Sequence, residues 1–183
     1  MAFKKSLSHS DSKDKARQAV LEFLPNNIKS LISLPAESFV FEAEVKFKNP
    51  DIKICGYENT KSVINNNKQK RFLMTQKFLD DYIHGDVLKA DLSTVDFAWL
   101  DLCNNPSLEV QSRFITQARN VKPGSRIVIT LVRRVRNMKN NSRPIATIDK
   151  FINLIHYLTN GKVVSQYNYV NEKSPMAMLF IQF

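Results

Sequence analysis

The sequence predicts an α/β fold, a doubly wound and mainly parallel sheet of seven strands that ends in an antiparallel hairpin. Helical and strand patterns alternate five times along the chain, as in proteins whose helices cover both faces of a parallel sheet. The last two strand patterns, 162–170 and 175–183, are joined by only four residues. Because parallel neighbours need a much longer connection, these two strands should be antiparallel.

The chain has 183 residues, of which 43% are hydrophobic, which suits one domain with a single core. We expect a flexible tail over 1–12 and one α/β domain over 13–183. The first fifteen residues lack the apolar segment of a secretory signal. No later stretch approaches the ~20 apolar residues of a membrane-spanning helix. We therefore expect a soluble, cytoplasmic protein with no membrane partner.

The chain is basic, with 27 lysines and arginines against 17 acidic residues and a net charge of +10. Such a balance favours polyanionic partners such as RNA or DNA, although charge that serves only solubility fits equally well. The two cysteines, Cys55 and Cys103, form no cluster with metal-ligand spacing. We therefore expect no metal site and a reduced intracellular setting.

The first half of the chain carries helical and strand patterns in turn. Between 13 and 23, apolar residues recur at helical spacing, with Asp11 and Ser12 available as caps and Pro25 as the stop. The polar run 59–70 is typical of a solvated loop or a weak helix start. The elements predicted here are helices at 13–23, 36–48 and 71–82 and strands at 30–35, 51–58 and 84–90.

The helix predicted at 36–48 has a single apolar face. Its members are Phe39, Val40, Ala43 and Phe47, which recur at helical spacing. This spacing predicts that the face is buried.

The second half begins with an apolar run at 95–102, which is typical of a strand buried on both faces. The segment 126–132 is the clearest strand by its β-branched content. Asn160 and Gly161 provide a C-cap signal for the last helix. The elements predicted here are strands at 95–102, 126–132, 162–170 and 175–183 and helices at 106–120 and 145–158.

Carboxylates occur near the ends of three predicted strands. Glu58 ends 51–58, Asp101 stands near the end of 95–102, and Asp86 follows a lone glycine just upstream. Parallel strands end at one edge of the sheet, where open α/β sheets form their ligand crevice. Any one of these acids alone is more often a solvated loop residue, but three at strand ends favour a binding site.

This layout resembles the class I methyltransferases, Rossmann-like proteins that bind S-adenosylmethionine. The resemblance covers 13–183 and rests on topology and spaced acids. It implies that Glu58 accepts hydrogen bonds from the ribose hydroxyls and that Asp86 lies beside the adenine amino group. The cofactor-binding residues that it implies are Leu34, Pro35, Ala36, Glu58, Asp86 and Asp101.

The first strand departs from the family pattern, which is acidic and glycine-rich. The segment 33–38 reads Ser-Leu-Pro-Ala-Glu-Ser and contains no glycine, so close approach of the backbone to a cofactor is harder. Cofactor binding is either retained with these small residues at the turn or lost. In the second case the protein keeps the fold only to bind other partners. The missing G-x-G-x-x-G also disfavours a dinucleotide-dependent oxidoreductase.

The segment 101–106, Asp-Leu-Cys-Asn-Asn-Pro, falls at the family's catalytic motif. It lacks the prolines and the aromatic residue of the amino-group enzymes. Cys103 follows the acid by two residues, whereas an RNA cytosine-5 methyltransferase has its cysteine at three, so we expect a buried or partly buried structural cysteine. The motif therefore names no methyl acceptor, and Asp101 is the first catalytic candidate and Asn104 the second.

These observations predict a methyltransferase-like protein that uses S-adenosylmethionine and acts on or binds nucleic acid. The alternative is a non-catalytic nucleic-acid-binding or assembly protein that retains the fold without the cofactor. The connection 133–143 is rich in cations that we expect to contact phosphates, although a solvated charge run explains them equally well. These cations are Arg133, Arg134, Arg136, Lys139 and Arg143.

Overall fold

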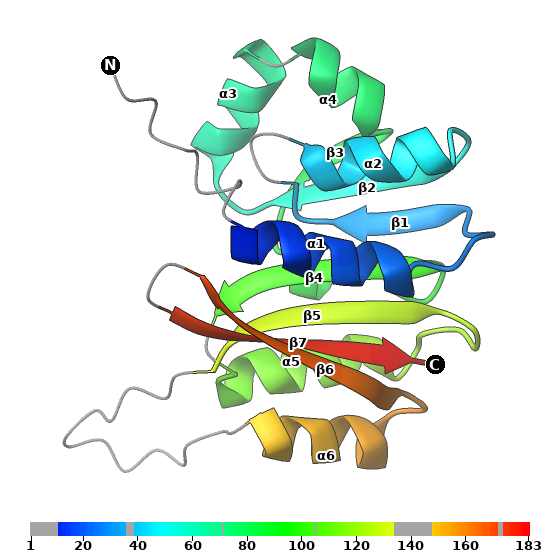
Figure 1. Cartoon of the computed structure of the whole chain (residues 1–183), viewed down its shortest axis with the longest axis vertical. Coiled ribbons are helices and arrows are strands. Elements are labelled where there is room, and N and C mark those ends of the chain that lie inside the picture. Colours follow the sequence, from blue (N-terminus) through cyan, green and yellow to red (C-terminus); the bar gives the residue numbers. More distant parts are fainter. Residues whose placement is uncertain (1–10, 36–38, 71, 105, 134–147, 172–173) are drawn as a thin grey trace.

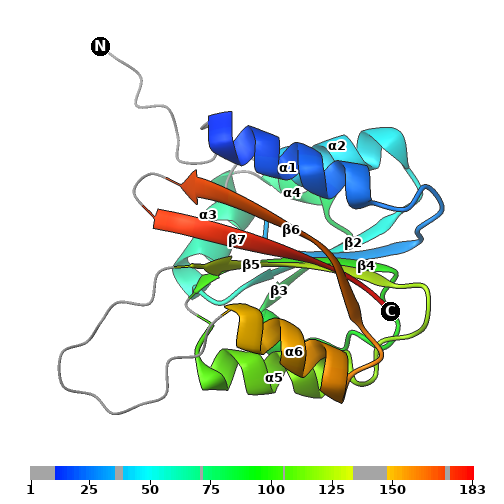
Figure 2. The ribbon, with the colours of Figure 1, turned by 60° about the horizontal axis from the view of Figure 1, so that its bottom comes forward.

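The computed structural model describes residues 11–35, 39–70, 72–104, 106–133, 148–171 and 174–183. A seven-stranded sheet with the order β3-β2-β1-β4-β5-β7-β6 forms the middle layer. Helices α1, α2 and α4 lie on one face of this sheet, and α5 and α6 lie on the other (Figure 1, Figure 2). The predicted doubly wound α/β architecture is therefore confirmed.

Six of the seven strands follow the sequence patterns, and β3 is the exception. Neighbouring strands are parallel from β3 through β5, and β7 runs antiparallel to both β5 and β6. The predicted C-terminal hairpin is thus confirmed. The strands are β1 (Ser30–Ser33), β2 (Lys53–Glu58), β3 (Asp81–His84), β4 (Phe97–Asn104), β5 (Arg126–Val132), β6 (Lys162–Asn171) and β7 (Ser174–Gln182).

Within the described ranges, none of the helices has the length and apolar character that a membrane span requires. The described part of the first helix begins at Asp11, which lies in its first turn. The helices are α1 (Asp11–Phe23), α2 (Val40–Lys48), α3 (Lys61–Lys70), α4 (Phe72–Phe78), α5 (Leu108–Ala118) and α6 (Ile148–Leu158), with a short 3-10 helix, η2 (Val87–Lys89).

The predictions for 71–82 and 84–90 were wrong in their boundaries. The helix α4 ends at Phe78, and Tyr82 belongs to strand β3. The segment predicted as a strand at 84–90 contains η2 instead, because the Asp86 side chain accepts a hydrogen bond from the Leu88 amide at 2.9 Å and so caps a helical turn. Side-chain capping therefore outweighed the weak strand pattern.

The predicted apolar face of α2 was also wrong. The residues that α2 buries are Phe41, Glu42 and Val45, whereas the side chain of Phe47 is 89% exposed. Phe39 is buried, but it precedes the helix in the left-handed conformation at φ 50°. Since the helix starts only after this turn, the face that meets the sheet differs from the one that spacing alone selects.

The core has two parts, one on each face of the sheet. On one face, Phe114 of α5 and Phe151 of α6 meet edge to face with ring centroids 5.5 Å apart. On the other face, Phe23 of α1 packs on Phe180 of β7 with ring centroids 5.1 Å apart. The sheet is therefore buried from both sides, as the apolar run at 95–102 predicted.

Asp96 joins β1 and β4 at their amino ends. Its Oδ2 accepts hydrogen bonds from the amides of Lys29 at 2.7 Å and Ser30 at 3.0 Å. Its Oδ1 forms an ion pair with Lys122 at 2.6 Å. Partial burial alone would raise the pKa of Asp96, but Lys122 and the two amides outweigh it and lower the pKa below 3.8. The ionised carboxylate therefore stabilises the fold.

We expect Asp96→Asn to lower the free energy of unfolding by about 1.5–3 kcal/mol at pH 7, the range for hydrogen bonds to charged groups. A lowered pKa means that this stabilisation is present above pH 3.8 and is lost as the pH falls through the folded-state value. Urea unfolding of both proteins at several pH values tests this. The control is Asp91→Asn, whose carboxylate caps only its own turn through Ser93, and equal losses in the two variants would contradict the assignment.

Candidate functional site

A large cavity opens at the carboxyl ends of β1, β2 and β4. Its volume is about 630 Å³, within the usual range for ligand sites of roughly 300–1,000 Å³. The loop after β3 and the first turns of α5 complete its wall. Its lining residues are Leu34, Pro35, Tyr57, Glu58, Asn59, Gly85, Asp86, Val87, Leu88, Asp101, Leu102, Ser107, Glu109, Val110 and Arg113.

The structure brings together the three acids that the sequence singled out, since Glu58, Asp86 and Asp101 all line this cavity. Leu34 and Pro35 line it as well. Ala36 lies outside the described residues, and the side chain of Asn104 is not part of the described structure. These three acids at or near strand ends therefore border one cavity.

Glu58, the last residue of β2, is partly buried. Its Oε1 accepts a hydrogen bond from the Thr60 amide at 2.8 Å, which holds the carboxylate at the edge of the sheet. A carboxylate offers about four acceptor positions. Glu58 therefore keeps acceptor capacity for a ligand with paired hydroxyl groups.

Asp86 is held from two sides. Besides capping η2 through the Leu88 amide, it forms an ion pair with Arg113 of α5. Arg113 also lies 3.6 Å from Glu109, one turn earlier on the same helix. Sequence reasoning missed Arg113, although the Glu109 and Arg113 pair at i, i+4 spacing was a visible signal of a charged helix face.

The turn after β1 has no glycine, and the structure shows how it is accommodated. Pro35 is buried and packs against Gly56 of the neighbouring strand β2. A Cβ at Gly56 would lie 2.9 Å from Pro35 Cγ and 2.9 Å from Leu79 Cδ1, closer than real Cβ contacts. The glycine that this region needs is therefore on β2, where it gives Pro35 room beside the cavity.

We expect Gly56→Ala to destabilise the protein by about 1–3 kcal/mol, because the added methyl group must displace the rigid ring of Pro35 or shift β2. Thermal and urea unfolding measure the loss. Gly85→Ala is the matched control, since a Cβ there comes no closer than 3.8 Å to Ile83 Cγ2. A Gly56→Ala protein as stable as Gly85→Ala would contradict the contact.

Asp101 stands where the pairing of β4 with β5 becomes irregular, between Asp101 and Asn104. Within this irregularity Cys103 adopts a left-handed conformation at φ 50° and its thiol donates to Asp101 Oδ1 at 3.2 Å. Desolvation and the charge of Asp101 raise the pKa of the Cys103 thiol to about 12. The thiol is therefore protonated at neutral pH and is no thiolate nucleophile.

The expectation that Cys103 is buried or partly buried was wrong, because the residue as a whole is exposed. Cys103 lies in the irregular part of β4, between Asp101 and Asn104, where its left-handed backbone interrupts the regular pairing with β5. Cys55, in β2, is partly buried.

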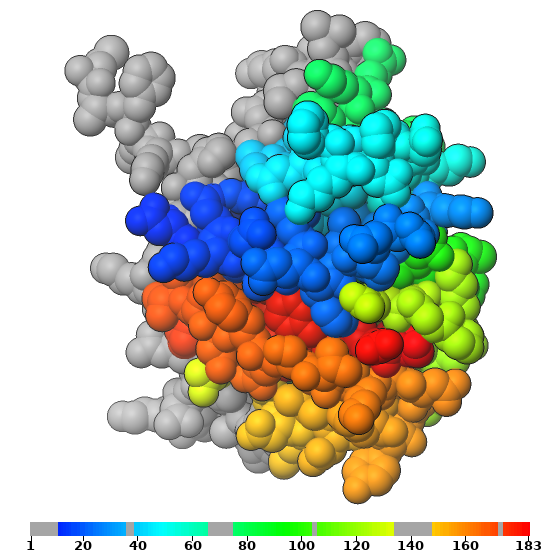
Figure 3. All heavy atoms as spheres, turned by 45° about the vertical axis from the view of Figure 1, so that its right-hand side comes forward, coloured from blue at the N-terminus to red at the C-terminus, as the bar shows by residue number. Residues whose placement is uncertain are grey.

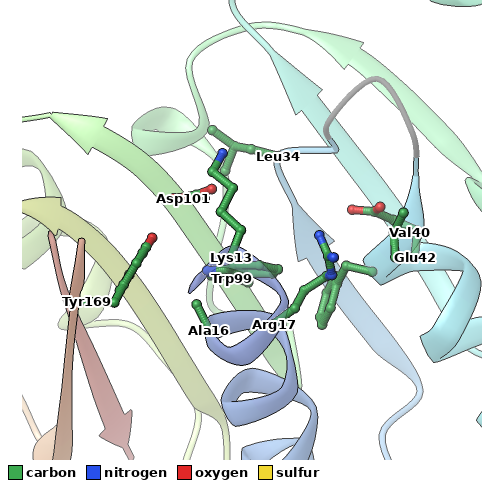
Figure 4. A pocket seen from close by; sticks show the side chains of 10 residues that line it. Lys13, Ala16, Arg17, Leu34, Val40, Glu42, Trp99, Asp101 and Tyr169 are labelled. Atoms are coloured by element: carbon green, nitrogen blue, oxygen red, sulfur yellow. The ribbon is translucent and has the colours of Figure 1, made fainter. Parts of the chain in front are cut away.

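A second, smaller cavity of about 50 Å³ lies beside the first, beneath α1 (Figure 4). It shares Leu34 and Asp101 with the larger cavity. The sequence did not reveal it, because its walls come from segments that only the tertiary structure brings together. Its lining residues are Lys13, Ala16, Arg17, Leu34, Val40, Phe41, Glu42, Trp99, Asp101 and Tyr169.

Glu42 is a buried acid in the wall of this smaller cavity, with only 2% of its surface exposed. Burial raises its pKa above 4.5 and outweighs the opposing effects of its backbone hydrogen bond, Ser33 and Arg17. The ionised form of Glu42 therefore lowers the stability of the fold, which is uncommon unless the residue has another role.

This position of Glu42 predicts a pH-dependent effect of Glu42→Gln. Because the folded-state pKa is raised, ionisation destabilises the wild-type protein progressively as the pH rises above 4.5. The free energy of unfolding of Glu42→Gln, relative to wild type, should therefore increase between pH 4 and pH 8. Urea titrations across this range measure it, with exposed Glu44→Gln as the control, and a difference independent of pH would contradict the shift.

The basic connection 133–143 lies almost wholly outside the described residues. Arg133 is exposed, and its amide donates to the Pro175 carbonyl at 2.7 Å, next to the hairpin of β6 and β7. The other four predicted phosphate contacts, Arg134, Arg136, Lys139 and Arg143, lie in the segment that the structure does not describe.

No protein-family model and no curated protein sequence matches the chain. Several solved structures share its fold. The cyclase SpnF has a TM-score of 0.64 at 13% identity, over 98% of this chain and 85% of SpnF. The N-methyltransferase NodS from Bradyrhizobium japonicum WM9, solved with S-adenosyl-L-homocysteine, has a TM-score of 0.64 at 10% identity, over 97% of this chain and 91% of NodS.

A third similar structure is the glycopeptide N-methyltransferase MtfA, also solved with S-adenosyl-L-homocysteine. It has a TM-score of 0.64 at 10% identity, over 96% of this chain and 91% of MtfA. The chain has the class I methyltransferase fold. Because SpnF is a cyclase, the fold by itself does not decide the reaction, and the site must be argued from its residues.

Proposed function

We propose that the protein binds S-adenosylmethionine in the larger cavity and transfers its methyl group to an acceptor. The observation that carries this proposal is the convergence of Glu58, Asp86 and Asp101 on one cavity of about 630 Å³ at the carboxyl edge of the sheet. In α/β sheets this edge is where ligands bind. The cofactor-bound structures of MtfA and NodS, which have the same fold, support the same assignment.

The residues present fit this cofactor. Glu58 would accept hydrogen bonds from both ribose hydroxyls, since a carboxylate matches a diol. Val87, Leu102 and Val110 line the cavity and would supply an apolar wall for the adenine ring. Asp86 is already paired with Arg113, so the pair, and not a lone carboxylate, would meet the adenine amino group.

Asp101 lines both cavities, which supports a role for it between cofactor and acceptor. When bound, the cofactor supplies a methyl group on a positively charged sulfur that is ready to leave. The protein then needs to align the acceptor and take up its proton. Asp101 can do both, because it belongs to the walls of both cavities, while the Cys103 thiol that donates to it stays protonated.

Isothermal titration with S-adenosyl-L-homocysteine tests this function. We expect binding by the wild-type protein and a loss of about 1.5–3 kcal/mol in Glu58→Ala, which removes charged hydrogen bonds to the ribose. Glu44→Ala, on the exposed side of α2, is the control and should bind as wild type does. No detectable binding by the wild-type protein at millimolar ligand would refute the proposal.

The net charge of +10 favours a second candidate function, the binding of nucleic acid without methyl transfer. The triple variant Arg133→Ala, Arg134→Ala and Arg136→Ala should then flatten the slope of log affinity against log salt by roughly 0.7–0.9 for each contact removed. Fluorescence anisotropy with a labelled single strand of RNA and with duplex DNA measures this slope. Unchanged affinity and slope would remove the basic connection as a binding surface.

A further inference from the structure

The smaller cavity is adjacent to the proposed cofactor site, since Leu34 and Asp101 belong to the walls of both. It lies under α1, between this helix, α2 and strand β4 (Figure 4). Figure 3 shows α1 on the molecular surface between α2 and β6. A group bound beneath α1 is therefore next to the larger cavity, and the inference that follows rests on the proposed function.

The volume of about 50 Å³ limits what this cavity accepts. A cavity of about 150 Å³ holds a benzene ring, whereas a single water molecule needs a cavity of roughly 10–15 Å³. A slim group of a few heavy atoms therefore fits beneath α1. An aromatic ring, including a nucleobase, is too large to enter.

Aromatic side chains form much of the wall. Phe41 meets Trp99 edge to face with ring centroids 4.7 Å apart, and Trp99 Nε1 already donates to Thr130 Oγ1 at 3.1 Å. Burial, followed by the charge of Asp101, raises the pKa of Tyr169, so its phenol is neutral. Aromatic rings attract cations and N–H groups and offer little to an anion.

Acidic groups stand on two sides of the cavity. Figure 4 shows the Asp101 and Glu42 carboxyl groups apart from each other, with Trp99 and Lys13 between them. Asp101 is only partly buried, whereas Glu42 is 2% exposed. Asp101 and Glu42 offer hydrogen-bond acceptors to an entering amine, beside the two cations of α1 that complete the wall.

Two cations on α1, Lys13 and Arg17, complete the wall. Arg17 forms an ion pair with Asp14. Positive charges near an amine favour its neutral form and so lower its pKa. Such a lowering serves methyl transfer, because an amine attacks only through the lone pair that its neutral form exposes.

We propose that the smaller cavity receives the primary amino group of an aliphatic amine and that this amine is the methyl acceptor. Its slim chain matches the volume, and its N–H groups face the aromatic rings and Asp101. The amine nitrogen forms a bond to the methyl carbon as the carbon–sulfur bond breaks with its electron pair on sulfur. The displaced amine proton passes to the Asp101 carboxylate and from there to water.

Three probes with the same carbon chain test the chemical class. We expect propylamine to bind in a ligand-observed NMR titration of the protein saturated with S-adenosyl-L-homocysteine, with propanol and propionate binding at least about tenfold more weakly. Preferential binding of propionate would overturn the proposal in favour of an anion site. Binding of S-adenosyl-L-homocysteine without any binding of propylamine would overturn it and leave the proposed function standing, whereas failure of S-adenosyl-L-homocysteine to bind would refute both.

Two variants test the proposed position of the amine, because they should change the affinity for propylamine in opposite directions. Asp101→Asn should weaken propylamine binding at least about tenfold, because it removes a charged acceptor. Lys13→Gln should strengthen it by up to about fivefold, because it removes a repelling charge. Lys15→Gln, at an exposed position of the same helix, is the control, and weaker propylamine binding in Lys13→Gln than in Lys15→Gln would overturn the assignment.

The fold of each variant is checked by circular dichroism and by its affinity for S-adenosyl-L-homocysteine. If Asp101→Asn alters cofactor affinity as well, Lys13→Gln still decides, because Lys13 lines only the smaller of the two cavities. Propionate gives the opposite sign, since loss of a cation weakens anion binding. The pair of probes on one variant thus separates an amine site from an anion site.

Discussion

Both cavities depend on the pairing of β1 with β4. In this pair Leu31 stands opposite Phe97 and Ser33 opposite Trp99. β1 ends at Ser33, whereas β4 continues to Asn104. Leu34 therefore follows the end of β1 beside the part of β4 that extends beyond β1 and contains Asp101. Asp96 joins the amino ends of the same two strands. A slip of one residue would turn Trp99 and Asp101 to the opposite face of the sheet and remove the boundary that the cavities share.

The wall of the larger cavity shows that a departure from a sequence pattern can be met by a neighbouring strand. The turn after β1 has a proline where glycine is the usual solution, and the ring of Pro35 fits because β2 has Gly56 beside it. The glycine that provides the space is therefore on the neighbouring strand β2 and not in the turn after β1. Packing, and not the local motif, therefore decides whether this edge of the sheet can border a ligand.

The positive net charge of the chain is not found in the wall of the larger cavity. Several cations are neutralised in ion pairs, among them Lys46 with Asp80 and Lys122 with Asp96 at the amino ends of the strands. The larger cavity is acidic, with Glu58, Asp86, Asp101 and Glu109 in its wall against Arg113. The larger cavity is therefore acidic although the whole chain is basic, which suits the positive charge at the sulfur of the cofactor that we propose.

The sequence by itself determined six of the seven strands, the connection between the last two and the edge at which three acids meet. Apolar runs such as β4 and the short connection to β7 depend on local chemistry, so pattern and length suffice to predict them. The tertiary structure decided which side chains are buried on α2, because the left-handed turn at Phe39 sets the rotation of that helix. It also decided the smaller cavity, where α1, α2, β4 and β6 meet. Lys13, Glu42 and Tyr169 are far apart in the chain, and only the packing of helices on the sheet makes them neighbours.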